Sequence, residues 1–190
     1  MLTLLLGCVP SLYTDATKDT GEYDNGWEAP ENQWSVNEPP STLKGEGCST
    51  GDVLNDHVGT DQHGDDVSLW QFYGSCSVID IGTMWCGPCR ELAAHFQETA
   101  ERYPEVQFIQ LLPEDDQGNP ASVEKLEEWA EFYEIEEPVI NDDAGWHQCS
   151  VPEDSFPAVL IVGPDMRVLD PGVTPANEAT IASRIEELCY

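Results

Sequence analysis

The chain has 190 residues, a net charge of −30 at pH 7, and only seven lysines and arginines against 37 aspartates and glutamates. Such an acidic surface repels phosphate groups, which excludes nucleic acid as a partner and electrostatic attraction to anionic lipid. A hydrophobic fraction of 40 % is enough for a buried core, and no apolar run is long enough to cross a bilayer. The length predicts one domain with an appendage.

The chain begins with the sequence Met-Leu-Thr-Leu-Leu-Leu-Gly-Cys at residues 1–8. Its last four residues resemble the lipobox of bacterial lipoproteins, where cleavage precedes a cysteine that then carries the lipid. The resemblance makes Cys8 the expected lipidation site. A secretory signal has a basic n-region and an apolar stretch of roughly 7–15 residues, and residues 1–8 are shorter and lack Lys and Arg. We therefore interpret them as a signal remnant with an upstream start codon, with an ordinary frayed terminus as the alternative.

The next segment, residues 9–47, is rich in Pro, acidic and small polar residues and contains no Ile, Phe or Met. This composition buries too little apolar surface to offset the entropy of ordering the chain. We therefore predict an acidic, flexible tether that leads to a domain over residues 48–190. Trp27 and Trp34 are the exceptions, and the sequence leaves open whether they dock on the domain or stay exposed.

The domain begins with a predicted β-hairpin. Residues 53–54 and 67–69 are short apolar runs that flank a turn-rich stretch at 59–66. His57 and His63 lie here among several acids. We interpret both as solvated turn residues, with a metal site as the less favoured alternative.

The centre of the domain is a buried strand that ends in a Cys-x-x-Cys sequence. Residues 78–81 are apolar and β-branched except for one acid, and a helix with an apolar stripe is predicted over residues 90–103. Cys86 falls at the helix N-terminus, where free N–H groups and the helix dipole stabilise a thiolate. Cys89 lies about one turn further along, within reach of a mixed disulfide at Cys86.

The remaining elements complete an α/β pattern. They are, in chain order, a helical turn at residues 70–73, a strand at 106–112, an acidic loop at 113–120, a helix at 122–133, a short strand at 138–140, an irregular segment at 142–155, two strands at 158–162 and 167–169, and a helix at 177–189. The acids of the loop lack the ligand spacing of a calcium-binding loop. Strands joined by a helix imply a parallel pair, and the last two strands form an antiparallel hairpin. We predict a mixed sheet with helices on both faces.

The sequence Trp-Cys-Gly-Pro-Cys at residues 85–89 resembles the thioredoxin active site, and residues 51–190 are similar to the membrane-tethered, extracytoplasmic thioredoxin-like reductases of the TlpA type. Asp80 lies six residues before Cys86, where thioredoxins carry a buried acid that assists proton transfer at the second cysteine. Phe156-Pro157 resembles the cis-proline that faces the dithiol. The resemblance implies a thioredoxin fold, with a mixed central β-sheet flanked by helices and an N-terminal β-hairpin extension.

The resemblance also implies a protein disulfide oxidoreductase and assigns its site. The residues expected to act in catalysis are Cys86, Cys89, Asp80 and Pro157. Those expected to contact the substrate are Trp85, Gly87, Pro88 and Phe156. Arg90 is either a solvated helix residue or a cation that favours the thiolate. The Gly-Pro dipeptide resembles that of reducing thioredoxins, so we expect a reductase, with exchange or oxidation as alternatives.

The same resemblance sets the expected partners and location. We expect disulfide-containing protein substrates, a membrane thiol relay as electron donor, and no cofactor or metal beyond the Cys86–Cys89 pair. A monomer in the bacterial periplasm or cell envelope, held at the membrane through a lipid anchor only, fits this function. The alternative is a redox-inert or metal-carrying binding module on the same scaffold. An intact Cys-x-x-Cys with its acid argues against an inert module, and His147 is a poor candidate for the dedicated histidine of metal carriers.

Four further cysteines are expected to form two structural disulfides: Cys48, Cys76, Cys149 and Cys189. Seven cysteines in all indicate an oxidising compartment. The four allow three connectivities. The start of the central strand and the end of the last helix should meet at the sheet end away from the dithiol, which favours Cys76–Cys189 and leaves Cys48–Cys149. Pairing by chain proximity, Cys48–Cys76 and Cys149–Cys189, remains open.

Overall fold

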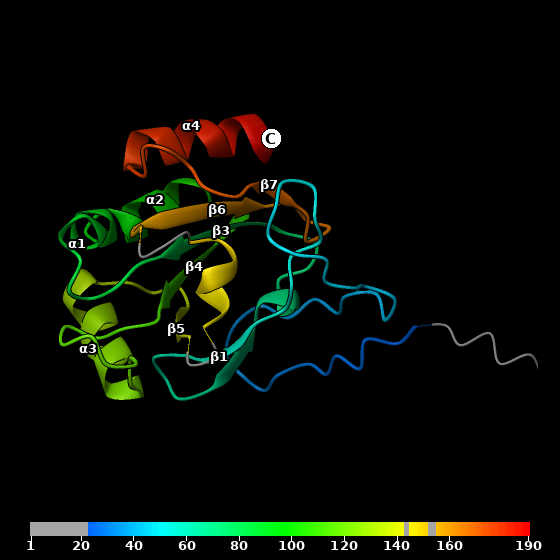
Figure 1. Cartoon of the computed structure of the whole chain (residues 1–190), viewed down its shortest axis with the longest axis horizontal. Coiled ribbons are helices and arrows are strands. Elements are labelled where there is room, and N and C mark those ends of the chain that lie inside the picture. Colours follow the sequence, from blue (N-terminus) through cyan, green and yellow to red (C-terminus); the bar gives the residue numbers. More distant parts are fainter. Residues whose placement is uncertain (1–22, 143–144, 152–154) are drawn as a thin grey trace, which may run out of the picture.

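The computed structural model describes residues 23–142, 145–151 and 155–190. Residues 1–22, with the predicted lipidation site Cys8, lie outside the described part. The centre is a five-stranded sheet in the order β5-β4-β3-β6-β7 (Figure 1). Its strands are β3 (Cys76–Ile81), β4 (Val106–Leu112), β5 (Val139–Asn141), β6 (Ala158–Val162) and β7 (Val168–Asp170). β3 pairs in parallel with β4 and antiparallel with β6, so the predicted mixed sheet is confirmed.

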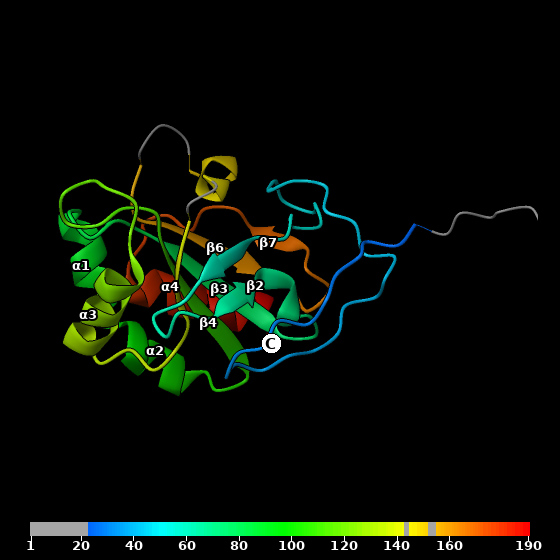
Figure 2. The same ribbon diagram turned by 90° about the horizontal axis from the view of Figure 1, so that it is seen from below.

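Side chains alternate between the two faces of the sheet along its buried strands, and this divides the apolar core into two layers. In β3, Val78 packs in one apolar cluster and Ile79 in the other, because successive side chains point to opposite faces. The first cluster contains buried apolar residues from all four α-helices. The second lies under the hairpin β1 (Val58–Thr60) and β2 (Asp66–Ser68) and the 3-10 turn η1 (Leu69–Gln71). α4 and the hairpin thus lie on opposite sides of the sheet (Figures 1 and 2).

The helices are α1 (Gly87–Ala93), α2 (Phe96–Arg102), α3 (Val123–Tyr133) and α4 (Glu178–Leu188). The single helix predicted at residues 90–103 is therefore wrong in two respects. It begins earlier, at Gly87, and it is broken after Ala93. At the break, the His95 N–H bonds to the carbonyl of Leu92, three residues back, and His95 leaves helical geometry with ψ near 1°. A tightened last turn of this kind ends α1 and lets α2 start in a new direction.

The N-terminal hairpin exists, but its first strand differs from the prediction. Val58–Thr60 pairs with Asp66–Ser68, whereas Val53 and Leu54 form only isolated bridges to residues 167 and 47. Val53 and Leu54 are buried in the second cluster instead. These two apolar residues therefore contact the core without forming a paired strand. A run of only two residues is too short for alternation to tell a strand from a buried loop.

Residues 23–47 lie along the domain beside the hairpin (Figure 1). The Trp27 Nε1–H donates to Ser68 Oγ at 2.8 Å, and the Trp34 Nε1–H donates to Asp61 Oδ2 at 2.6 Å. Both tryptophans pack against the second cluster. The composition predicted a free tether here, but two indole rings supply the apolar area and the N–H donors that dock this part of it.

Two disulfides tie distant parts of the chain together. Cys48 pairs with Cys149, with Cα atoms 5.9 Å apart, and Cys76 pairs with Cys189, with Cα atoms 5.8 Å apart. This is the connectivity that the sheet topology favours. Cys76 begins β3, and Cys189 follows the last residue of α4. The closed loops span 101 and 113 residues, so each bridge restricts the unfolded chain strongly.

We expect the two bridges to differ in their effect on stability. Replacing Cys76 and Cys189 by Ser should lower the free energy of unfolding by about 5 kcal/mol, which is the loop-closure entropy expected for a loop of this length. The Cys48→Ser, Cys149→Ser variant should lose less, because the 3-10 turn η2 (Trp146–Cys149) has no buried residue and can open locally. Denaturant unfolding of both variants measures this. Equal losses, or the reverse order, would contradict it.

Candidate active site

The two cysteines of the dithiol are joined as a disulfide at the start of α1. Cys86 is the N-cap residue, with extended backbone, and its Sγ accepts a hydrogen bond from the Cys89 N–H at 3.2 Å. Pro88 lies in the first helical turn, where its missing N–H costs no intrahelical bond. The N–H that faces Cys86 and the N-terminal dipole of α1 both favour negative charge on this sulfur once the disulfide is reduced.

The structure differs from the sequence-based expectation that the two cysteines differ in exposure. Cys86 is 5 % exposed and Cys89 2 %. Both sulfurs are thus shielded in the disulfide form, and the expected contrast between an outward and an inward cysteine is wrong here. What distinguishes Cys86 is its position at the helix N-terminus.

Asp80 is buried in β3, below this loop. Its pKa is raised from 3.8 to about 7, chiefly because burial removes the carboxylate from water. The Gln110 side-chain N–H donates to Asp80 Oδ2 at 2.9 Å and partly offsets the rise. Asp80 Oδ1 is buried and has no hydrogen-bond partner among the described residues. An acid with one free oxygen and a pKa near neutrality can accept and return a proton.

Gln110 is itself fixed in orientation. The Trp129 Nε1–H, from α3, donates to Gln110 Oε1 at 2.5 Å, so the amide must present its N–H groups toward Asp80. Asp80 and Gln110 are register partners in the parallel pair β3–β4. Sequence analysis missed both Gln110 and Trp129. The available signals were a glutamine in the middle of the buried, mostly apolar strand β4 and a tryptophan on the inward face of α3.

Gly82 brings the dithiol close to the sheet. A Cβ at this position would lie 3.1 Å from Cys89 Cβ and 3.2 Å from Cys89 Sγ. Any side chain here would therefore push Cys89 away. Asp80 lies two residues before Gly82, a separation of about 7 Å in extended backbone, so the buried acid is near the cysteine that Gly82 contacts.

The residues predicted to contact substrate surround the dithiol. Trp85 is 46 % exposed and meets Phe156 edge-on, with ring centroids 6.2 Å apart. The Phe156–Pro157 peptide bond is cis. Ala158 is the register partner of Ile81, so Pro157 lies beside the end of β3 from which the dithiol loop leaves. Gly87 and Pro88 are exposed.

Glu114 is a further residue that sequence analysis missed. Its carboxylate accepts a hydrogen bond from Trp85 Nε1 at 2.6 Å, and its carbonyl accepts one from the Met84 N–H at 3.1 Å. Glu114 follows β4 in the acidic loop, so the loop after β4 holds the tryptophan of the dithiol motif in place.

His57 and His147 both lie next to Asp142. The His147 Nδ1 is 2.5 Å from Asp142 Oδ2, and the His57 Nδ1 is 3.9 Å from Asp142 Oδ1. His57 is only 5 % exposed, which corrects its interpretation as a solvated turn residue. The ring centroids of His147 and Phe156 are 5.9 Å apart. In the described part of the chain, no three His, Cys, Asp or Glu side chains form a group that could hold a metal ion.

Comparison with known proteins agrees with this geometry. A family model described as Thioredoxin matches residues 71–128, a span that contains β3, the dithiol and β4. A thioredoxin H-type from Oryza sativa subsp. indica is 35 % identical over 63 residues, which cover 33 % of this chain and 43 % of the relative. A thioredoxin from Ophiophagus hannah is 40 % identical over 40 residues, 21 % of this chain and 38 % of the relative. The matched segment spans less than half the length of these relatives.

Solved structures resemble more of the chain. The thioredoxin domain of a thiol-disulfide oxidoreductase from Bacteroides vulgatus has a TM-score of 0.62 at 16 % identity, covering 75 % of this chain and 99 % of that one. A secreted disulfide oxidoreductase from Mycobacterium tuberculosis has a TM-score of 0.56 at 20 % identity, covering 70 % and 96 %. The protein therefore has a thioredoxin fold, with a mixed central sheet flanked by helices and a small N-terminal hairpin. The Cys86–Cys89 disulfide lies inside the segment that matches the Thioredoxin family model.

Proposed function

We propose that the protein is an extracytoplasmic thiol–disulfide oxidoreductase that reduces, or exchanges, disulfides of protein substrates through Cys86 and Cys89. The observation that carries this proposal is the Cys86–Cys89 disulfide at the N-terminus of α1, above a buried acid whose pKa is about 7. A fold alone would not suffice, since the thioredoxin scaffold also hosts other functions.

The reaction starts from the reduced protein. The Cys86 thiolate attacks one sulfur of a substrate disulfide, whose S–S bond breaks, and the departing substrate sulfur takes up a proton. Cys89 gives its proton to the Asp80 carboxylate, and the resulting thiolate attacks Cys86 Sγ. This closes the Cys86–Cys89 disulfide and releases the second substrate thiol, which recovers the proton from Asp80. Two electrons and two protons pass to the substrate, and a thiol relay must then reduce the protein again.

The surroundings of the dithiol support contact with an extended substrate chain. Trp85, Gly87 and Pro88 expose the loop, and Phe156 adds an apolar edge. Pro157 keeps a bulkier side chain away from the sulfurs in this proposal, and the backbone beside it offers β-type pairing to the substrate.

A location outside the cytoplasm is supported by two features. Cys48–Cys149 and Cys76–Cys189 are disulfides that an oxidising compartment preserves, and one structural relative is described as secreted. Anchoring through a lipid on Cys8 is part of the proposal. Among the described residues, no helix is both long enough and apolar enough to span a membrane. Mass spectrometry of the mature N-terminus tests the anchor, and an uncleaved protein with an unmodified Cys8 would refute it.

The activity is tested with reduced protein and a disulfide-bonded protein substrate such as insulin. We expect one substrate disulfide to be reduced per protein molecule, with the Cys86–Cys89 bond formed in return. A reduction potential of about −270 mV would identify a reductase, and a potential of about −120 mV would identify an oxidant. A folded protein that exchanges with no disulfide would refute the proposal and favour the redox-inert module. Incubation with metal ions then tests the metal carrier.

A further inference from the structure

A surface groove of about 450 Å³ lies beside the dithiol, between the start of α1 and helix α3. The residues that matter here are Met84, Arg90, Lys125, Trp129, Phe132 and Tyr133. Met84 precedes Cys86 by two residues, so their Cα atoms are within about 7.6 Å of each other. The Arg90 N–H bonds to the Cys86 carbonyl at 3.2 Å. The groove is therefore lined by Met84, which is close to Cys86 in the chain, and by Arg90, whose backbone contacts that of Cys86.

One wall of the groove is aromatic and extends into solvent. Tyr133 lies between Trp129 and Phe132, with ring centroids 4.6 and 4.8 Å away. Phe132 is 76 % exposed, the largest value among the exposed large hydrophobic residues of the described part. The apolar stripe of α3 that faces the core uses Leu126, Trp129 and Ala130, so packing of the sheet does not account for Phe132. Trp129 is held rigidly by Gln110, which makes this wall a preformed surface.

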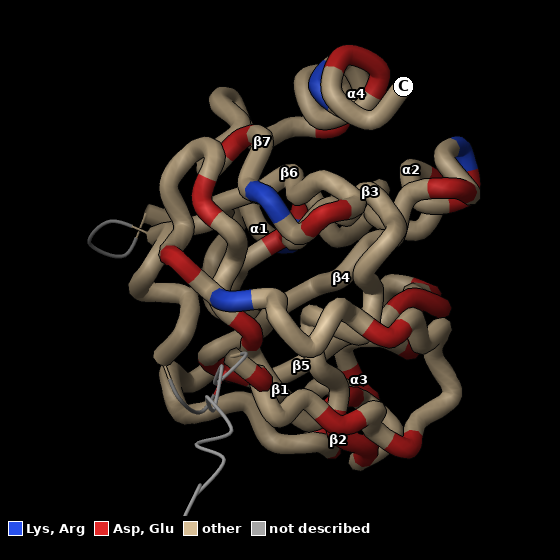
Figure 3. The backbone as a smooth tube through the Cα atoms, turned by 90° about the vertical axis from the view of Figure 1, so that its right-hand side faces the viewer, with Lys and Arg blue, Asp and Glu red and all other residues tan. Residues whose placement is uncertain are grey.

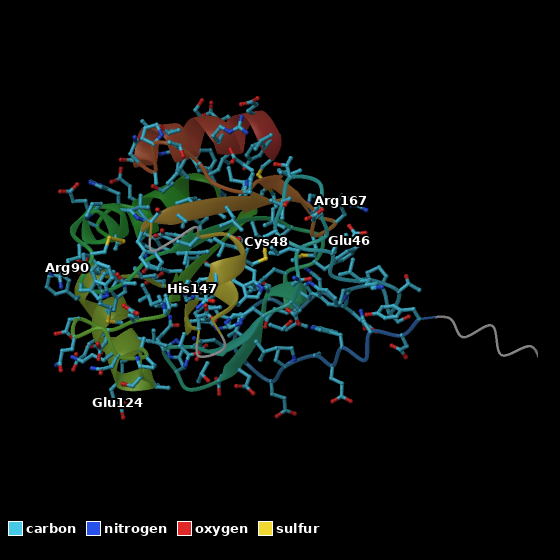
Figure 4. All side chains as sticks on the ribbon, in the orientation of Figure 1. Glu46, Cys48, Arg90, Glu124, His147 and Arg167 are labelled. Carbon is cyan, nitrogen blue, oxygen red and sulfur yellow. A yellow bond between two sulfur atoms is a disulfide. The ribbon has the colours of Figure 1, made fainter. Side chains whose placement is uncertain are left out.

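The charge of the groove is unusual for this protein. Basic residues are sparse along the backbone and acidic ones are frequent (Figure 3). Of the six lysines and arginines in the described residues, four form ion pairs with acids. Lys44 lies over the Tyr23 ring. Arg90 donates from Nε to the Met84 carbonyl at 2.6 Å and pairs with no carboxylate among the described residues. It lies at the edge of the molecule between α1 and α3 (Figure 4).

At the far end of the groove, the positive charge of Lys125 is already paired with acids. Lys125 Nζ lies 2.8 Å from Glu128 and 3.6 Å from Asp116. An anion entering the groove would therefore meet a free cation only at Arg90. A guanidinium with unused N–H groups is suited to a carboxylate, which it can bind through two parallel hydrogen bonds.

We propose that this groove binds a segment of the disulfide-bearing substrate in which a large apolar side chain lies beside an acidic one. The apolar side chain packs on Phe132 and Tyr133, and its neighbouring carboxylate pairs with Arg90. The inference rests on the proposed function and adds the sequence that the substrate carries near its disulfide. Salt screens the repulsion from the net charge of −30 at separations beyond about 8 Å, so an acidic side chain in the groove responds chiefly to the charges beside it. The groove thus selects a short motif, not an acidic protein. A second copy of the chain, equally charged, is a poorer occupant.

The test uses synthetic two-cysteine peptides, oxidised, with a Phe-Asp pair two to four residues from one cysteine. Two analogues carry Phe-Lys or Ser-Asp instead. For the wild-type protein, we expect kcat/KM to be about threefold higher for Phe-Asp than for Phe-Lys, and about tenfold higher than for Ser-Asp. Arg90→Glu should reverse the first preference, so that Phe-Lys becomes the better peptide. Phe132→Ser should abolish the preference for Phe-Asp over Ser-Asp.

Each preference is a ratio of two peptides on one protein, so any change in the reactivity of Cys86 cancels. Arg167→Glu is the matched charge control, because Arg167 lies at the opposite side of the molecule from Arg90 (Figure 4). Equal rates for all peptides, or preferences unchanged in Arg90→Glu and Phe132→Ser, would overturn the proposal. A dimer in sedimentation that Phe132→Ser dissolves would also overturn it, by assigning the groove to a second copy. No reaction even with a small aromatic disulfide would instead refute the proposed function.

Discussion

Changing Cys89 to Ser will trap substrate on Cys86 as a stable mixed disulfide, whereas changing Cys86 to Ser will abolish both exchange and trapping. Cys86 is the N-cap of α1 and receives the Cys89 N–H, so the negative charge of a thiolate is stabilised there. Without Cys89 no second thiolate can attack Cys86, and the mixed disulfide persists. Non-reducing electrophoresis and mass spectrometry of the adduct measure both results.

Limited alkylation of the reduced wild-type protein near pH 6 gives an independent measure. The two cysteines are almost equally buried in the disulfide form, so we attribute a difference in labelling of the reduced protein to thiolate formation at the helix N-terminus. We expect Cys86 to be labelled first. The Cys86→Ser protein serves as the control, in which the remaining thiol should react slowly. Faster labelling of Cys89, or normal reduction of a disulfide by the Cys86→Ser protein, would contradict the assignment.

The sequence predicts well those residues of the site that lie close together in the chain. The strand, the acid within it and the dithiol motif occupy residues 76–89, and a strand, a turn and a helix N-terminus follow from that order alone. The cis bond before Pro157 was expected from resemblance, and it is present in the structure. Local composition and spacing hold this information because the groups that react are neighbours in the chain.

The partners of those residues are not local, and sequence analysis missed them. Gln110 and Trp129 meet Asp80 through the register of β3 with β4 and the packing of α3, neither of which a single sequence specifies. Residues 23–47 were interpreted from average composition, but two indole side chains determine where they lie. The break between α1 and α2 has a similar origin. Leu92, Ala93 and Phe96 are all buried in one cluster, so the apolar stripe continues across a break in backbone geometry.

Asp80→Asn should slow closure of the Cys86–Cys89 disulfide by about 100-fold, the usual loss on removing a general base, while making the folded protein more stable at pH 8. The wild-type acid has a pKa of about 7 when folded, against an ordinary value of 3.8 for an exposed aspartate. The folded state therefore holds this proton more tightly than the unfolded chain does. Its contribution to stability falls as the pH rises from about 4 to 7, and above pH 7 the full cost of a buried carboxylate remains.

That cost corresponds to about 4 kcal/mol at one pKa unit per 1.36 kcal/mol, and an uncharged Asn avoids it. The free energy of unfolding of Asp80→Asn should exceed that of the wild type at pH 8, and the difference should vanish below about pH 4. Chemical denaturation at several pH values measures this. A variant that is less stable at pH 8 than the wild type would show that the carboxylate serves packing and not proton transfer.

The same role of Asp80 predicts how the rate of disulfide exchange depends on pH. In the wild type, the rate at which Cys89 resolves the mixed disulfide should rise through pH 7 as Asp80 loses its proton, and this rise should be absent in Asp80→Asn. Gln110→Leu removes the hydrogen bond that lowers the pKa of Asp80, so its rate profile should shift to higher pH. Gln107→Leu is the matched control, since Gln107 lies on the same strand but bonds to Glu137, and its profile should follow that of the wild type. Identical profiles in all four proteins would exclude Asp80 as the base.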